Sequence, residues 1–395
     1  MKFNIELISP LIIKDSNELF PIDFFIYDNN SVYRVDIDTT ISNISNNKKL
    51  LDEFNKIIRM DNDNPIRLND FYSRLEKLNL LSKIYPSIRI DNKEFIKQQN
   101  ISNYIGFFKT INSKVYYVPY IPGSTIKGAI RNALMYKILK EKKTMYYKNI
   151  NKDKYIKQNV CEGIKEDIKE TKNKKFLNNI EKQIFSYNSK SKDLSLYDIF
   201  KYVQITDFIP NNMEKISIGI YPIISHRRNY LNLVLSGQFE GEISINKSLK
   251  NQIIKNENKE LLEDRLKNLF ALEENEINKM PENFGEIERK IILNLLATLQ
   301  EFTKDNISKY PERYPKININ NDTKSYYSFL GSGKGVNLNT VLLALSTTVL
   351  PALSTEDRKK VYSKDFPPKT YSLAIINNEY YKPGYVKISL SQSGE

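Results

Sequence analysis

The sequence predicts an α+β fold of two units, each with an antiparallel sheet and a long helical insertion. The chain has 395 residues, more than the roughly 250 to 300 that one hydrophobic core supports. Hairpin patterns occur in both halves, and stretches of helical apolar spacing interrupt both. We therefore expect one unit at residues 1–200 and a second at 201–395.

Strand signals open the first half. Residues 3–7 alternate apolar and polar side chains, which is typical of a half-buried strand. Residues 24–27 and 32–35 are aromatic and β-branched runs on either side of four turn-forming residues, so they predict a hairpin. From about 45 to 100 the apolar residues recur at helical spacing, which predicts a helical insertion.

A lysine-rich segment follows at residues 137–192. It contains sixteen lysines and seven acidic residues, so most of the chain's formal charge of +13 lies here. Two interpretations stay open, a solvated helical linker and an arm that faces phosphate groups. The overall charge suits a polyanionic partner without identifying one.

The second half repeats the alternation of strands and helices. Strand-like runs occur at 202–205 and 216–220, and the runs at 231–235 and 239–243 flank a Ser-Gly pair that predicts a second hairpin. A helical insertion is expected at about 250–310. Its predicted buried stripe consists of Ile287, Ile291, Leu295, Leu299 and Phe302.

The most informative segment, residues 115–134, is predicted to form a strand, a tight turn and a helix. Pro122 and Gly123 make the turn, and Ser124 or Thr125 can cap the helix. The buried stripe of that helix is Ile126, Ile130, Leu134 and Ile138.

Lys127 and Arg131 lie one turn apart on a different face of this helix. A helix N-terminus with a hydroxyl and basic residues nearby is a good phosphate site. An ordinary capped amphipathic helix is the alternative. A nucleotide-binding P-loop is excluded, because Ala129 and Ile130 stand where Lys and Ser/Thr are required.

A second glycine cluster, Gly331, Gly333, Lys334 and Gly335, follows an aromatic strand. Such a loop can point backbone N–H groups at phosphate. A sharp structural connection explains the same pattern.

Aromatic and basic residues supply further candidates. Tyr116, Tyr117 and Tyr120 precede the first glycine turn and could stack on bases or pack in the core. His226 lies beside Arg227 and Arg228 in a basic stretch. It could contact phosphate, act as a general base, or lie in a solvated turn.

The composition leaves few routes to catalysis. One cysteine, Cys161, and one histidine, His226, exclude an internal disulfide and an ordinary Cys/His zinc site. The carboxylates are scattered, so we predict no catalytic residue, metal or cofactor. No apolar run reaches signal-peptide or membrane-spanning length, and we expect a soluble, cytoplasmic protein without a membrane partner.

The segments at residues 121–131 and 331–335 resemble the signature and the glycine-rich loop of the RAMP superfamily of CRISPR-associated RNA-binding proteins. Five further segments resemble one branch of that family, the subunits that cap the crRNA 3′ end in type III-A Csm effector complexes. They are residues 7–11, 21–28, 198–207, 367–370 and 383–388. Departures occur at Ile13-Lys14, where a glycine is usual, and at Phe208, where a serine is common.

The resemblance implies two ferredoxin-like (RRM-like) domains and a non-catalytic subunit. It would bind the 3′ portion of the crRNA, end the backbone filament, and support crRNA maturation and antiviral defence. Its expected partners are crRNA, the adjacent RAMP backbone subunit and other Csm subunits, with a host maturation nuclease as an open question. Carried onto this sequence, the RNA contacts fall on the two glycine turns, the basic stretch and Lys369. An endoribonuclease of the same superfamily is the alternative.

Overall fold

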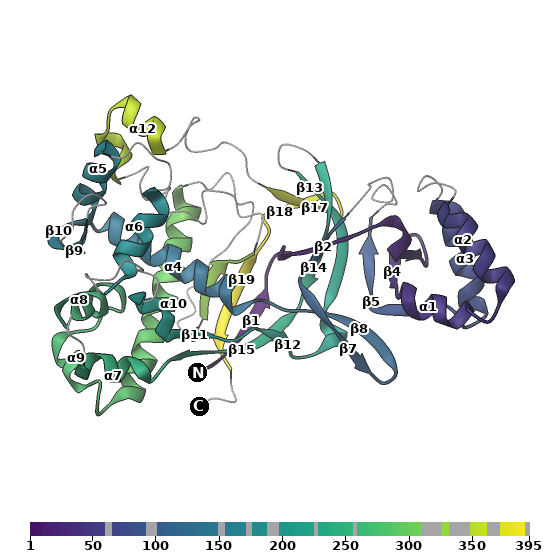
Figure 1. The fold of residues 1–395 in the computed structure, drawn as a ribbon, viewed down its shortest axis with the longest axis horizontal. Helices are drawn as coiled ribbons and strands as arrows, with labels where there is room; N and C mark the ends of the chain where they lie inside the picture. Colours follow the sequence, from purple (N-terminus) through teal and green to yellow (C-terminus); the bar gives the residue numbers. More distant parts are fainter. Residues whose placement is uncertain are drawn as a thin grey trace.

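Two β-sheets lie at the centre of the computed structural model, and helices gather at both ends of an elongated molecule (Figure 1). The structure describes residues 1–59, 65–91, 101–148, 155–170, 176–187, 197–224, 228–255, 259–309, 325–331, 348–361 and 372–391.

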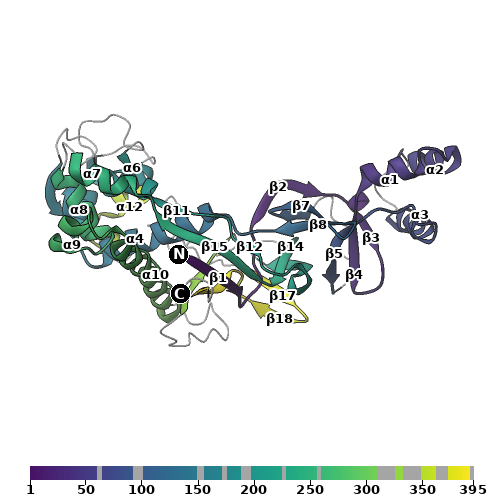
Figure 2. The ribbon, with the colours of Figure 1, turned by 90° about the horizontal axis from the view of Figure 1, so that it is seen from below.

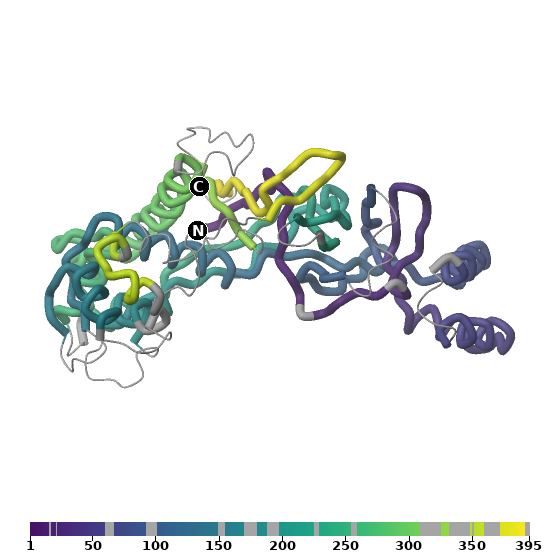
Figure 3. Tube along the Cα trace, turned by 90° about the horizontal axis from the view of Figure 1, so that it is seen from above, coloured from purple at the N-terminus to yellow at the C-terminus, as the bar shows by residue number. Residues whose placement is uncertain are grey.

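The first sheet brings the two ends of the chain together. Its strand order is β11 (Val203–Ile205), β15 (Gln238–Ile245), β1 (Lys2–Leu7), β19 (Tyr385–Leu390) and β16 (Ser325–Phe329), and β12 (Ile209–Pro210) also pairs with β15. Every one of these pairs is antiparallel. The first strand therefore lies directly beside the last, as the tube in Figure 3 shows.

The second sheet is larger and mixed. Its path is β2 (Lys14–Leu19), β6 (Ile101–Tyr104), β14 (Arg228–Ser236), β13 (Ser217–Ile224), β5 (Lys83–Ile90), β4 (Ser31–Val35) and β3 (Phe24–Ile26). Four strands branch from it: β7 (Gly106–Ile111), β8 (Lys114–Pro119), β17 (Leu373–Ile376) and β18 (Glu379–Tyr381). Strand β5 pairs in parallel with both β13 and β8, and β6 pairs in parallel with β14.

Helices form two separate groups at the ends of the molecule (Figure 2). One group is α1 (Ile37–Ile44), α2 (Lys48–Arg59) and α3 (Pro65–Lys77). The other comprises α4 (Gly123–Lys140), α5 (Val160–Glu170), α6 (Phe176–Phe185), α7 (Ser248–Lys255), α8 (Lys259–Leu269), α9 (Glu274–Lys279), α10 (Phe284–Lys309), α12 (Thr355–Val361) and the hairpin of β9 (Thr144–Tyr147) and β10 (Ile156–Asn159). Short 3₁₀ turns are η1 (Pro21–Asp23), η4 (Ile199–Tyr202), η5 (Met213–Lys215) and η8 (Leu350–Ala352).

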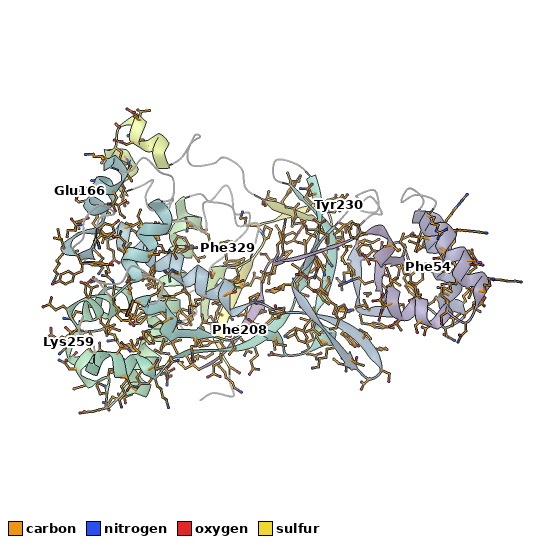
Figure 4. All side chains as sticks on the ribbon, in the orientation of Figure 1. Phe54, Glu166, Phe208, Tyr230, Lys259 and Phe329 are labelled. Carbon is orange, nitrogen blue, oxygen red and sulfur yellow. The ribbon has the colours of Figure 1, made fainter. Side chains whose placement is uncertain are left out.

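Separate cores stabilise these parts. Helices α4 and α10 pack on each other and share one core with the first sheet, and the stripes predicted for both helices are buried in it. A second core lies under α1–α3, where Phe54 stacks on Phe71. Figure 4 shows Phe54 and Phe208 in these two different regions.

The predicted hairpin of residues 231–235 and 239–243 is wrong. Strand β14 pairs with β13 and β6 in the second sheet, whereas β15 pairs with β1 in the first. The chain crosses between the sheets at Gly237, where a Cβ atom would lie 2.4 Å from the Ile216 side chain. The hairpin that forms instead joins β13 to β14.

The helical insertion expected at 45–100 is shorter than predicted. Its described helices end at Lys77, and residues 83–90 form β5 in the middle of the second sheet. Alternate residues of β5, Ile84, Ile88 and Ile90, are buried, so the strand follows a period of two that the longer helical pattern obscured.

The lysine-rich segment is not a linker in its described residues. They form β9, β10, α5 and α6, whose apolar side chains join the main core. Lysines remain at the surface while residues such as Ile164 and Ile184 are buried, because an amphipathic helix needs apolar residues on one side only.

Both sheets combine strands from before and after residue 200, so the expected boundary there does not coincide with a division between sheets. The predicted α+β class, with mainly antiparallel sheets and helical insertions, is confirmed. None of the described helices has the length and apolarity that crossing a membrane requires.

Replacement of a buried residue of α4 tests the shared core. Ile130 has 0 % exposure, so Ile130→Asp places an unpaired charge in apolar surroundings. We expect a loss of more than about 4 kcal/mol in the free energy of unfolding, measured by urea denaturation. Asn132→Asp, on a partly exposed position of the same helix, is the control and should change that free energy by less than about 1 kcal/mol.

Candidate nucleic-acid interface

The turn before α4 is fixed by its contact with a distant segment. Ile121 and Phe208 exchange backbone hydrogen bonds of 2.9 Å in each direction. Pro122 has the extended ψ of 133° that precedes a helix. A Cβ on Gly123 would lie 2.1 Å from the Ile205 carbonyl oxygen, so only glycine fits here.

The first N–H of α4 is capped by a carboxylate from the same segment. The Gly123 N–H donates to Oδ1 of Asp207 at 2.9 Å, and neither Ser124 nor Thr125 caps the helix as predicted. Asp207 lies where the helix dipole favours negative charge. A phosphate at this N–H would have to displace it.

Lys127 also contacts this segment. Its ammonium donates to the Val203 carbonyl at 2.7 Å. Burial lowers the pKa of Lys127, Asp198 opposes that shift and Arg131 adds to it. Lys127 thus joins α4 to β11 and still places positive charge near the turn.

The Arg131 guanidinium contacts side chains from α6 and from the start of η4. It pairs with Glu181 and, at 2.6 Å, with Asp198, and it lies 4.0 Å from the centre of the Phe185 ring. Two carboxylates neutralise its charge locally. This geometry gives Arg131 a structural role in joining α4, α6 and η4.

One exposed face of α4 remains open. Ser124 is exposed, and one turn later Gly128 has no described heavy atom within 4 Å of the position a Cβ would occupy. A glycine inside a helix costs about 1 kcal/mol relative to alanine, and no described neighbour requires this one. The sequence prediction did not include Gly128 among the site residues, although a glycine inside a helical pattern is the signal that marks it as a candidate.

The three candidate tyrosines do not form one surface. Tyr117 is buried, and its hydroxyl donates to Asp15 at 3.2 Å beneath the Arg34 guanidinium. Tyr116 points to the opposite side of β8 and contacts Tyr85. Tyr120 is half-buried against Phe107, and burial raises its pKa.

Other predicted sites are only partly described. Gly331 has φ +77°, and a Cβ there would lie 2.2 Å from the Ile12 carbonyl oxygen, so the backbone itself requires glycine. The candidates outside the described residues are His226, Arg227, the Arg228 side chain, Gly333, Lys334, Gly335 and Lys369.

The described residues form no cluster of three or more His, Cys, Asp or Glu side chains suited to a metal ion. The described part of the site consists of α4, the contacts that hold it to residues 198–207, which we call the clasp, and the open face at Ser124 and Gly128. The clasp comprises the bonds of Gly123, Lys127 and Arg131 to Asp207, Val203 and Asp198. The open face offers the Ser124 hydroxyl and close backbone approach at Gly128, with the Lys127 ammonium nearby, and these are properties of a phosphate-binding surface.

Comparisons with known proteins agree with these motifs. A family model described as the RAMP superfamily matches residues 4–385. "CRISPR system Cms protein Csm5" of Methanocaldococcus jannaschii is 28% identical over 379 residues, covering 92% of this chain and 76% of the relative.

Two solved structures are similar to this chain. A chain in a cryo-EM structure of a Csm–crRNA–target RNA ternary complex of a type III-A CRISPR-Cas system aligns with a TM-score of 0.66 at 19% identity, over 99% of this chain and 100% of that one. The crystal structure of T. onnurineus Csm5 aligns with a TM-score of 0.49 at 16% identity, over 98% of this chain and 100% of that one.

Removal of the Arg131 side chain tests its structural role. Arg131→Ala leaves Glu181 and Asp198 without their shared partner, so we expect a loss of about 2 kcal/mol or more in the free energy of unfolding. Lys140→Ala breaks the more exposed pair with Asp305 and should cost less than about 1 kcal/mol. An Arg131→Ala variant with unchanged stability and lost RNA binding would instead assign the guanidinium to phosphate.

Proposed function

The chain belongs to the RAMP superfamily, and from this membership and the geometry of α4 we propose that it is a non-catalytic RNA-binding subunit of a type III-A Csm effector complex. In this proposal it binds the 3′ portion of the crRNA and caps the filament of backbone subunits. It thereby supports crRNA maturation and antiviral defence. Its partners are crRNA, the adjacent backbone subunit and other Csm subunits, and a maturation nuclease can dock on the assembled complex.

The open face of α4 carries this proposal. Gly128 and Ser124 lie in the family signature segment, and no described neighbour accounts for the glycine. A missing side chain lets a sugar–phosphate backbone approach the helix closely. Guide sequences vary, so contacts to phosphate and sugar suit a subunit that must accept any spacer.

The assignment to this kind of complex follows from the relatives. The M. jannaschii relative is called Csm5, and the structure with a TM-score of 0.66 is that of a Csm complex with crRNA and target RNA. The M. jannaschii relative matches 92% of this chain and 76% of its own length, which supports the same position in an assembly.

A substitution on the open face tests RNA contact separately from folding. Gly128→Glu adds bulk and negative charge where the helix has room, so we expect at least about tenfold weaker crRNA binding with an unchanged or higher melting temperature. Gly285→Glu is the matched control, because Gly285 is also helical with no described atom within 4 Å of a Cβ. Equal RNA affinity of the Gly128→Glu variant and wild type would overturn the assignment of this face.

Catalysis is tested with the purified chain. We expect no cleavage of labelled crRNA precursor, with or without a divalent metal, and no effect of His226→Ala on guide maturation in the complex. The physical reason is the lack of an acid and base pair, since the chain has one histidine and its described carboxylates form no cluster. Cleavage by the wild-type chain that His226→Ala abolishes would establish the endoribonuclease alternative.

A further inference from the structure

A row of tyrosines crosses the second sheet on one side. Tyr27, at the end of β3, contacts Tyr33 of β4 with ring centroids 5.6 Å apart. Tyr33 contacts Tyr85 of β5 at 5.4 Å, and Tyr85 contacts Tyr116 of β8 at 5.6 Å. The strand register aligns Tyr85 with Tyr116, so the row runs perpendicular to the strands. We call these four residues the tyrosine ladder.

Lysines line the same side of the sheet. Lys114 lies two residues before Tyr116, with its ammonium 5.0 Å from the Tyr85 ring centre. Lys109 of β7 is directly opposite Tyr116 in the antiparallel pair. Both lysines are exposed, and in the described structure neither forms an ion pair.

Lys83 differs from these two lysines. Its ammonium lies 5.0 Å from the Tyr33 ring centre and also pairs with Glu76 of α3. Tyr33 packs against the core of α1–α3 as well. The inner part of the ladder is therefore fixed by the helices, whereas Tyr27, at 57% exposure, and Tyr116 lie toward its outer parts.

Packing within the protein accounts for the inner part of this arrangement only. Tyr27 is 57% exposed, and the ammonium groups of Lys109 and Lys114 form no ion pair in the described structure, although Lys114 lies over the Tyr85 ring. One exposed and three partly exposed rings beside two lysines without an ion pair match the composition of a surface that stacks bases and neutralises phosphates. An acidic protein surface would use the lysines but would leave the rings without a planar partner.

The face also continues toward a polar cavity. Ser87 and Arg89 lie on the same side of β5 as Tyr85, and both line a cavity of about 690 Å³ with Tyr221, Asn377 and Asn378. Asp28 and Asp91 also line it, so base and ribose edges suit it better than phosphate.

We propose that the tyrosine ladder, with Lys109 and Lys114, binds a single-stranded segment of the guide RNA. This inference rests on the proposed RNA-binding function and adds a second contact surface to it. Strand β8 carries Tyr116 and then leads through the turn at Gly123 into α4. The six residues between Tyr116 and Gly123 span roughly 20 Å when extended, so one RNA strand can run from the open face of α4 to the ladder.

The test uses the full chain with labelled single-stranded guide RNA, measured by fluorescence anisotropy over a salt series. The double variant Lys109→Gln and Lys114→Gln should have a shallower plot of log affinity against log salt concentration. The magnitude of the slope should fall by about 1.4, because each lost phosphate contact contributes about 0.7. Lys49→Gln with Lys56→Gln, on exposed positions of α2, removes the same charge elsewhere and should leave the slope unchanged.

Stacking is tested separately. Tyr27→Leu with Tyr116→Leu should weaken binding by about tenfold or more and reduce ultraviolet cross-linking of RNA to peptides of β5 and β8. Tyr146→Leu, on β9 in the opposite helical group, is the aromatic control. The melting temperature of each variant confirms that it is folded.

The outcomes separate this inference from the proposed function. Unchanged RNA affinity in both ladder variants, with wild type binding normally, overturns the ladder and leaves the proposed function standing. Normal RNA affinity with failure to assemble with other subunits assigns the face to a protein partner and also overturns it. A wild-type chain that binds no guide RNA, alone or in the complex, overturns the proposed function itself.

Discussion

The clasp between the start of α4 and residues 198–207 positions the rest of the candidate site. It consists of the hydrogen bond from Gly123 to Asp207, the bond from Lys127 to Val203, and the pairing of Arg131 with Asp198. Strand β11 of the clasp pairs with β15, which pairs with β1. Helix α4 is thereby fixed to the sheet that joins the two ends of the chain, and its exposed face is held in one orientation.

The clasp also determines which groups of the site are available to bind a ligand. Carboxylates of the same chain already occupy the helix N-terminus and the Arg131 guanidinium, so the two strongest predicted anion sites are used internally. The groups that remain available on α4 are those that the clasp does not use, above all Ser124 and the backbone at Gly128. The residue type alone does not show whether a basic side chain is already paired within the protein or is available to bind a ligand.

Local patterns predicted local structure well. The stripes of α4 and α10 are buried as expected, because each is set by one-sided packing at a fixed period. Sheet pairing was not predictable in the same way. The runs on either side of Gly237 look like a hairpin, yet each pairs with strands far away in sequence. Arg131 and Asp198 are likewise 67 residues apart, and no spacing rule connects them.

Strand β8 shows how one short segment can contribute to the core with one side and to the proposed binding surface with the other. Tyr117 points to one side, where it is buried beneath Arg34, and Tyr116 points to the other, where it joins the tyrosine ladder. The buried side anchors the strand to the sheet, and the contact between Tyr116 and Tyr85 helps to hold the outward side in place. A stacking surface needs such rigidity, because ordering mobile rings at the moment of binding would oppose association. The same strand ends at the turn into α4, and the anchoring of Tyr117 therefore also fixes how the tyrosine ladder is placed along the chain relative to the start of that helix.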